Sequence, residues 1–215
     1  MGTFMTTNQM VIPNDPDDPK GAFSWNCPID EKMNTLILLN RGRMTIRDCT
    51  LSLHFLQRST ETPLPAIILN NETESNLDNL DIKGNQMNPT VGIIVRNCHT
   101  VIKECRINKH LKGAILIAGD STNAIKVNGC KFYKNSFANI EVTGMGCKPV
   151  IEQNIIFESE GTGITVNVGA SPKIVSNLIK KAKIGIEVVS AEPIIFKNKI
   201  ELSAEDGILT RTYKS

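Results

Sequence analysis

The segment Ile151-Glu-Gln-Asn154-Ile-Ile156 is followed by Ile174-Val-Ser-Asn177-Leu-Ile179 and Ile195-Phe-Lys-Asn198-Lys-Ile200, at intervals of 23 and 21 residues. The same pattern occurs four more times upstream, with Cys able to replace Asn and other apolar residues able to replace Ile. The seven central residues are Cys49, Asn85, Cys105, Cys130, Asn154, Asn177 and Asn198. A repeat of roughly 20 to 25 residues is typical of a solenoid, in which each repeat forms one turn.

A second row of residues recurs with the same period but out of phase with the first. It often reads Gly-Ile-x-Val, as in Gly163-Ile-Thr-Val166. Its members are Ile67, Ile93, Ile115, Ile140, Ile164, Ile186 and Ile208. Apolar residues around both rows alternate with polar ones in short stretches rich in Ile and Val, which indicates β-strands separated by Gly, Asn and Pro turns. Leucine-rich repeats are excluded, because the repeats lack several leucines and a helical return, so the rows predict a parallel β-helix.

The row of Asn and Cys residues is explained by a tight corner in each coil. Asn tolerates the left-handed backbone region that such a corner needs. Stacked Asn amides can also hydrogen bond from coil to coil, as they do in fibrils. Cys is small and commonly buried, so it fits the same inward position. We therefore interpret all seven positions as a structural ladder.

Three of the repeats begin with proline, in Pro149-Val-Ile-Glu-Gln-Asn154, Pro172-Lys-Ile-Val-Ser-Asn177 and Pro193-Ile-Ile-Phe-Lys-Asn198. With these segments, residues 36–210 resemble parallel β-helix repeats of the CASH type. The resemblance implies an all-β fold, a right-handed single-stranded parallel β-helix of about seven coils. Such repeats occur in carbohydrate-active enzymes of the pectin-lyase superfamily and in non-enzymatic regions of F-box-only substrate receptors and Shc-SH2-binding proteins. The pattern is closer to the second group, although one fold hosts many functions.

The two ends of the chain differ from the repeats. Residues 1–35 contain four prolines and an acidic cluster, which predicts an extended N-terminal segment. Within it, Phe23-Ser-Trp25-Asn-Cys27 is expected to cap the open end of the stack. The β-helix is then expected over residues 36–210, followed by a tail at 211–215.

Composition argues against several classes of protein. A net charge of +2 and only 5% aromatic residues do not suit a nucleic-acid binder, which needs a basic stripe and stacking aromatics. The chain has no run of about 20 apolar residues that could span a membrane. Its start lacks the basic and apolar regions of a secretory signal. We therefore expect an intracellular protein, cytoplasmic or organelle-associated.

The six cysteines do not follow a disulfide or metal-binding pattern. There is no Cys-x-x-Cys, and no His lies at a zinc-like distance from a cysteine pair. The nearest approach to a metal cluster is Cys98-His99 with Cys105, which we interpret as turn residues beside a core cysteine. His54 and His110 are expected to lie in solvated turns. We predict free thiols, no metal site and no cofactor.

The residue after each Ile of the second row should point outward, on the face where enzymes of this fold carry their active sites. These outward residues are Ile68, Ile94, Leu116, Glu141, Thr165, Glu187 and Leu209. Polygalacturonase-like sites need several converging aspartates, and pectate-lyase sites need an aspartate-rich calcium cluster. This face offers two glutamates in coils two apart, roughly 10 Å between backbones. We therefore expect a non-enzymatic protein; the alternatives are a carbohydrate-active lyase or hydrolase and a non-catalytic glycan binder.

Ile68, Ile94 and Leu116 lie in successive coils and should form an apolar patch. Monomeric proteins seldom leave such a patch exposed. The first full repeat is longer than the others, which predicts polar loops at 57–65 and 70–79. Either these loops or a partner protein should cover the patch.

The C-terminal end of the stack is a second candidate interface, with Ile195, Ile208 and Arg211 at its edge. Only residues 211–215 follow the last coil. An open end presents unpaired backbone groups over an aliphatic core. We expect another chain to cover it by β-augmentation, or a longer polypeptide to continue it. The sequence thus predicts a protein-interaction module or a structural subunit of a larger intracellular assembly.

Overall fold

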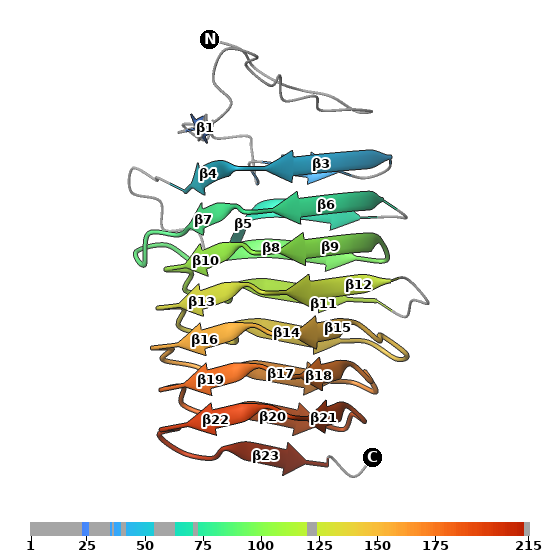
Figure 1. Cartoon of the computed structure of the whole chain (residues 1–215), viewed down its shortest axis with the longest axis vertical. Helices are drawn as coiled ribbons and strands as arrows, with labels where there is room; N and C mark the ends of the chain where they lie inside the picture. Colours follow the sequence, from blue (N-terminus) through green and yellow to red (C-terminus); the bar gives the residue numbers. More distant parts are fainter. Residues whose placement is uncertain are drawn as a thin grey trace.

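The computed structural model describes residues 23–25, 35, 37–39, 42–53, 63–70, 73–119 and 124–212. Within these ranges every regular element is a β-strand, and the strands stack in coils along one axis (Figure 1). In this part of the chain, no helix is long and apolar enough to cross a membrane.

The strands form three parallel sheets, which we name A, B and C. Sheet A contains, in order, β1 (Phe23–Trp25), β4 (Cys49–Ser52), β7 (Asp81–Lys83), β10 (Arg106–Asn108), β13 (Lys131–Tyr133), β16 (Ile155–Phe157), β19 (Leu178–Lys180) and β22 (Lys199–Glu201). Sheet B contains β2 (Ile37–Leu39), β5 (Leu64–Asn70), β8 (Thr90–Arg96), β11 (Ile115–Ala118), β14 (Ile140–Thr143), β17 (Ile164–Asn167), β20 (Ile186–Val189) and β23 (Ile208–Arg211). Sheet C contains β3 (Arg43–Arg47), β6 (Glu74–Asp78), β9 (His99–Lys103), β12 (Ile125–Asn128), β15 (Val150–Glu152), β18 (Lys173–Val175) and β21 (Ile194–Phe196).

Each coil passes through sheets B, C and A in that order. The seven strands of sheet C each lie in one such coil, from β2–β3–β4 to β20–β21–β22. Every strand pairs in parallel with its counterparts in the neighbouring coils, so one whole coil provides the long connection that parallel strands need. The predicted all-β parallel β-helix of about seven coils is confirmed.

The inner face of sheet B is lined by the second row of isoleucines. The register pairs Ile67 with Ile93 and continues in this way to Ile208. From Ile67 to Ile186 these side chains are 0–1% exposed. Burying one such side chain contributes roughly 2 kcal/mol. The remaining core is also mostly aliphatic, and Phe132 is its largest fully buried side chain.

Close packing between neighbouring coils explains the glycine that precedes several of these isoleucines. A Cβ atom at Gly163 would clash with the carbonyl oxygen of Gly185 in the next coil. A Cβ atom at Gly185 would clash in the same way with Gly207. The Gly-Ile-x-Val pattern therefore records the close approach of neighbouring coils where sheet B begins.

At the corner between sheets C and A, the residue immediately before the ladder residue has a left-handed backbone conformation. The φ angle is 56° at Gln153, 53° at Ser176 and 56° at Lys197, and all three side chains are exposed. The expectation that the ladder Asn itself takes the left-handed backbone is therefore wrong. The preceding residue makes the bend, and the bend turns the following side chain into the core.

Asn85 does not belong to the ladder, which corrects the sequence prediction. The residues that follow Cys49, Leu80 and Cys105 pair with one another, so Leu80 occupies this corner in the second coil. Leu80 is 1% exposed and fills the site with apolar contacts. Asn85 lies at the next corner, after β7, where its Oδ1 accepts two backbone N–H groups at 3.0 and 3.1 Å. The sequence pattern required Asn or Cys and therefore selected the wrong corner.

The predicted loop at 70–79 is also wrong, because Asn70 ends strand β5 and residues 74–78 form strand β6. Its polar residues Glu74, Asn76 and Asp78 alternate with buried ones, which places them on the outer face. The predicted loop at 57–65 ends in strand β5, and residues 54–62 lie outside the described ranges. The extra length of this repeat therefore falls mainly between β4 and β5.

At the N-terminal end, β1 pairs with β4 at the edge of sheet A. Apart from Thr35, the rest of the predicted N-terminal segment and its cap lies outside the described residues. The same is true of the last three residues of the predicted tail.

Candidate functional site

The outer face of sheet B brings the predicted outward residues into one column. Each lies opposite its counterpart in the neighbouring strand, and the column begins one coil earlier than predicted. Its members are Leu38, Ile68, Ile94, Leu116, Glu141, Thr165, Glu187 and Leu209. From Leu38 to Glu187 the column divides into an aliphatic part and a polar part, with the change between β11 and β14, and Leu209 on the last strand is again aliphatic.

The aliphatic part, which we call the apolar strip, consists of Leu38, Ile68, Ile94 and Leu116. Leu38 is 49% exposed, and Ile68 and Leu116 are half-buried. Ile94 is 8% exposed although it lies outside the core cluster. Strands in a sheet lie about 4.8 Å apart, so each side chain covers the flank of the next. The strip is thus a continuous apolar ridge across four successive strands.

The polar part of the column holds the two glutamates, each with a partner from the neighbouring outward position. Asn167 Nδ2 donates to Glu141 Oε1 at 3.2 Å, and Arg211 Nε lies 3.4 Å from Glu187 Oε1. Burial raises the pKa of Glu141, and the hydrogen bond from Asn167 opposes this shift. Sequence reasoning missed both partners, although each lies two residues beyond the column on its strand.

The two glutamates have different surroundings. A carboxyl group whose pKa is raised, as that of Glu141 is, suits a general acid, and the carboxylate of Glu187 lies beside the Arg211 guanidinium. They lie two strands apart, because Thr165 separates them in the register. Such spacing is of the order found between the carboxyl groups of inverting glycosidases.

The first row of corner residues forms a hydrogen-bonded ladder in its C-terminal half. Asn154 Nδ2 donates to Asn177 Oδ1 at 3.0 Å, and Asn177 Nδ2 donates to Asn198 Oδ1 at 2.9 Å. Each Oδ1 also accepts the backbone N–H of the ladder residue in the preceding coil, at 2.9–3.0 Å. The thiols of Cys105 and Cys130 donate to backbone carbonyls instead, at 3.2–3.6 Å. These polar groups form hydrogen bonds with one another and with the backbone. We therefore assign the row a structural role.

A second polar row lies at the corner between sheets A and B, and the sequence reasoning missed it. Asn135 Oδ1 accepts the backbone N–H of His110 at 3.0 Å, and Asn135 Nδ2 donates to Asn139 Oδ1 at 2.9 Å. The expectation that His110 is solvated is wrong, since the side chain is fully buried. Its Nδ1 lies 3.2 Å from Thr90 Oγ1, and its Nε2 has no hydrogen-bond partner among the described residues. Burial lowers the pKa of His110 to about 4.

Residues 65–215 match the family model for the right-handed β-helix region. The chain belongs to the right-handed β-helix family. No curated protein and no solved structure matches it. The family match establishes the fold and its handedness. Evidence on function must come from the residues on the outer faces of the β-helix.

The last coil of the β-helix holds the other predicted interface residues. Ile208 is 51% exposed, whereas Ile186, its counterpart one coil earlier, is fully buried. Ile195 is half-buried and packs against the core cluster. Arg211 is exposed and reaches the Glu187 carboxylate. The C-terminal face therefore presents core-type side chains to solvent.

Proposed function

We propose that this β-helix is a non-enzymatic protein-interaction module, or a structural subunit of a larger intracellular assembly. The observation that carries the proposal is the apolar strip, which crosses four strands of sheet B. Aliphatic ridges of this kind are features of interaction sites, because their burial against a partner is favourable. The partner surface would be an apolar groove that accepts Ile68 and Leu116.

The last coil supports a second contact of the same assembly. Ile195 and Ile208 are core-type residues, and among the described residues β21 and β23 are edge strands of their sheets. A further strand, from another chain or from further coils of the same polypeptide, would pair with the backbone of β23 and bury Ile208. This contact lies at the opposite end of sheet B from the apolar strip.

The cysteines support an intracellular setting for the module. The five described cysteines are free and buried. Burial raises the pKa of Cys49 and of Cys147 to about 11, which keeps both as unreactive thiols. Buried, unpaired thiols are common in reducing compartments.

The proposal is tested by co-purification from the native source, followed by mass spectrometry. The double variant Ile68→Lys/Leu116→Lys places charges on the strip, and Thr165→Lys places one lower in the same column as a matched control. The wild type and Thr165→Lys should retain the same partner proteins, and the double variant should lose them. Retention of the same proteins by the wild type and both variants would contradict the assignment of the strip.

A second candidate function is cleavage of a polysaccharide, and the raised pKa of Glu141 favours it. The test is Glu141→Gln together with Glu187→Gln, assayed on neutral and acidic polysaccharides. Under our proposal neither the wild type nor this variant cleaves any of them. A cleaving activity that the double variant loses would replace the proposal, and binding without cleavage would favour a non-catalytic glycan binder.

A further inference from the structure

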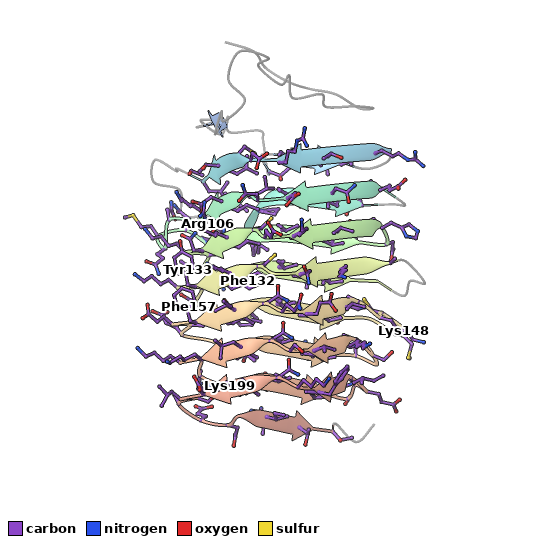
Figure 2. The ribbon with its side chains drawn as sticks, viewed as in Figure 1. Arg106, Phe132, Tyr133, Lys148, Phe157 and Lys199 are labelled. Carbon is purple, nitrogen blue, oxygen red and sulfur yellow. The ribbon has the colours of Figure 1, made fainter. Side chains whose placement is uncertain are left out.

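The outer face of sheet A carries an aromatic pair that the proposed function does not use. Tyr133 of β13 and Phe157 of β16 occupy the same register position in neighbouring coils. Their ring centroids are 5.1 Å apart and their planes differ by 14°, so the rings are stacked. Figure 2 shows both on the same side of the molecule as Arg106 and Lys199, whereas Lys148 lies on the opposite side.

The aromatic pair continues into an aliphatic surface. Ile155 occupies the other outward position of β16 and is 36% exposed. Leu178 lies next to it on β19 and is half-buried. We call the surface formed by Tyr133, Ile155, Phe157 and Leu178 the aromatic platform.

Cations outnumber carboxylates around this platform. The outward positions of sheet A from β7 to β22 hold the cations Lys83, Arg106, Lys131, Lys180 and Lys199 and the carboxylates Asp81 and Glu201. The adjoining corner row adds the cations Lys109, Lys134 and Lys181 and the carboxylate Glu158. Five plus three cations therefore stand against two plus one carboxylates, a net charge of +5 on this face.

The two carboxylates of these strands lie away from Tyr133 of β13, because Asp81 is on β7, two strands before it, and Glu201 is on β22, three strands after it. Asp81 Oδ2 lies 2.9 Å from Lys83 Nζ, and Glu201 Oε1 lies 2.6 Å from Lys199 Nζ. Both acids are thus engaged by cations at the ends of the face. The excess positive charge is left in the middle, beside the platform.

Three lysines around Tyr133 carry that excess. Lys131 and Lys134 flank Tyr133 along the chain, and Lys109 occupies the same corner position as Lys134 in the preceding coil. All three are exposed, and none forms an ion pair with any residue that the structure describes. Three unpaired cations beside an apolar platform form a surface suited to an acidic ligand that also has apolar groups.

The orientation of the rings discriminates between classes of ligand. Stacking from coil to coil covers the facing side of each ring, so a flat base could stack only on the outer side of one of them. A nucleobase binds by stacking against an open ring face. The ring edge instead carries partial positive charge, which attracts carboxylate oxygens. The geometry therefore favours a peptide with acidic and aliphatic side chains over a nucleic acid.

We propose that the aromatic platform, together with Lys109, Lys131 and Lys134, binds an acidic peptide segment of a partner protein. Apolar side chains of the segment contact Tyr133 and Phe157, and its Asp or Glu side chains pair with the lysines. The platform lies on a different sheet from the apolar strip. Each of the two proposals can therefore be tested independently of the other.

The test uses fluorescence anisotropy with a short labelled peptide that alternates Glu with Leu and Phe. A matched peptide with Gln in place of every Glu should bind about tenfold more weakly. Lys131→Glu should weaken binding of the Glu peptide by about tenfold. Lys148→Glu makes the same charge change at an exposed lysine on the other side, and it should leave affinity within about twofold.

A second variant separates the platform from general electrostatics. Tyr133→Ala, with its thermal unfolding checked against the wild type, should weaken the peptide by about tenfold, because aromatic anchors dominate such contacts. Ile68→Lys/Leu116→Lys should not change this affinity. The proposal is overturned if the wild type does not bind the peptide, or if Lys131→Glu and Lys148→Glu weaken it equally. It is also overturned if polyuridylate or polygalacturonate binds more tightly than the peptide and loses affinity in Tyr133→Ala.

Discussion

The inner and outer positions of sheet B are one residue apart on each strand, yet they follow different rules. From β5 to β23 the inner position is always Ile. The outer position beside it is aliphatic as far as β11, then becomes Glu, Thr and Glu, and is Leu on β23. Inner residues meet the next coil in the core, whereas outer ones meet solvent or a partner. The inner positions therefore determine the fold, and the function that we propose depends on the outer ones.

The largest difference in the free energy of unfolding is expected between the inner and the outer position of one strand. Ile164→Ala should lower the free energy of unfolding by about 4 kcal/mol, because it leaves a cavity in the core. Thr165→Ala, its outward neighbour, should change it by less than about 0.5 kcal/mol. Urea unfolding of both variants measures the difference. Equal losses would mean that the strand is not oriented as described.

A slightly smaller effect is expected from the buried imidazole of His110. Its pKa is about 4 in the folded state, below the ordinary value of 6.5 that applies when unfolded. As pH falls from 6.5 toward 4, the unfolded state binds a proton that the folded state does not. Stability should therefore be full above pH 6.5 and fall by about 3 kcal/mol toward pH 4.

Because carboxylates also titrate in this range, the control for this prediction is His110→Asn. Asn is the residue found at the equivalent position of the next coil, Asn135. Urea unfolding over the same pH range should give a shallower loss for the variant. Identical pH profiles for the two proteins would contradict the burial of His110.

The ladder gives the next prediction. Asn177→Leu removes the acceptor for Asn154 N–H and the donor to the Ile151 carbonyl, so it leaves buried polar groups unpaired. We expect a loss of about 2 to 3 kcal/mol in urea unfolding. Leu80 shows that the corner itself accepts Leu, so the cost arises from the amide partners. Asn198→Leu, in the half-buried last coil, should cost less; equal losses would argue against the ladder.

The smallest stability effect is expected at an outer corner. Val168 is 60% exposed and has a φ angle of 52°, a backbone conformation that a β-branched residue rarely adopts. Val168→Asn should raise stability by about 1 kcal/mol, because Asn tolerates this region. Val175→Asn, at an outward strand position, should give no gain. Thermal unfolding of both variants distinguishes relief of backbone strain from a general effect of Asn.

The sequence predicted those features that repeat for a physical reason. A period of two along each strand and of one coil along the chain determines the Ile row and the outward column from Ile68 to Leu209. The ladder failed in one coil, because Leu80 fills the corner without a polar side chain while Asn85 imitates the pattern at another corner. The sequence pattern required Asn or Cys, whereas the corner between sheets C and A accepts any side chain that can pack into the core there.

The repeat pattern of the sequence could not predict side-chain contacts between neighbouring coils. The Asn167–Glu141 hydrogen bond and the Arg211–Glu187 ion pair join residues whose register must first be known. The stacking of Tyr133 on Phe157 likewise needs the pairing of β13 with β16. Outer side chains are not repeated, so their contacts emerge only once the coils are aligned.

We propose that the aliphatic part of the outer column of sheet B, from Leu38 to Leu116, contacts another protein and that the polar part does not. The most direct measurement places a photo-crosslinking residue at Leu116 or at Thr165, two strands apart in one column, and exposes the protein to light in extract from its native source. We expect discrete protein adducts from position 116 and few or none from position 165. Equal labelling from both positions, or none from position 116, would contradict it.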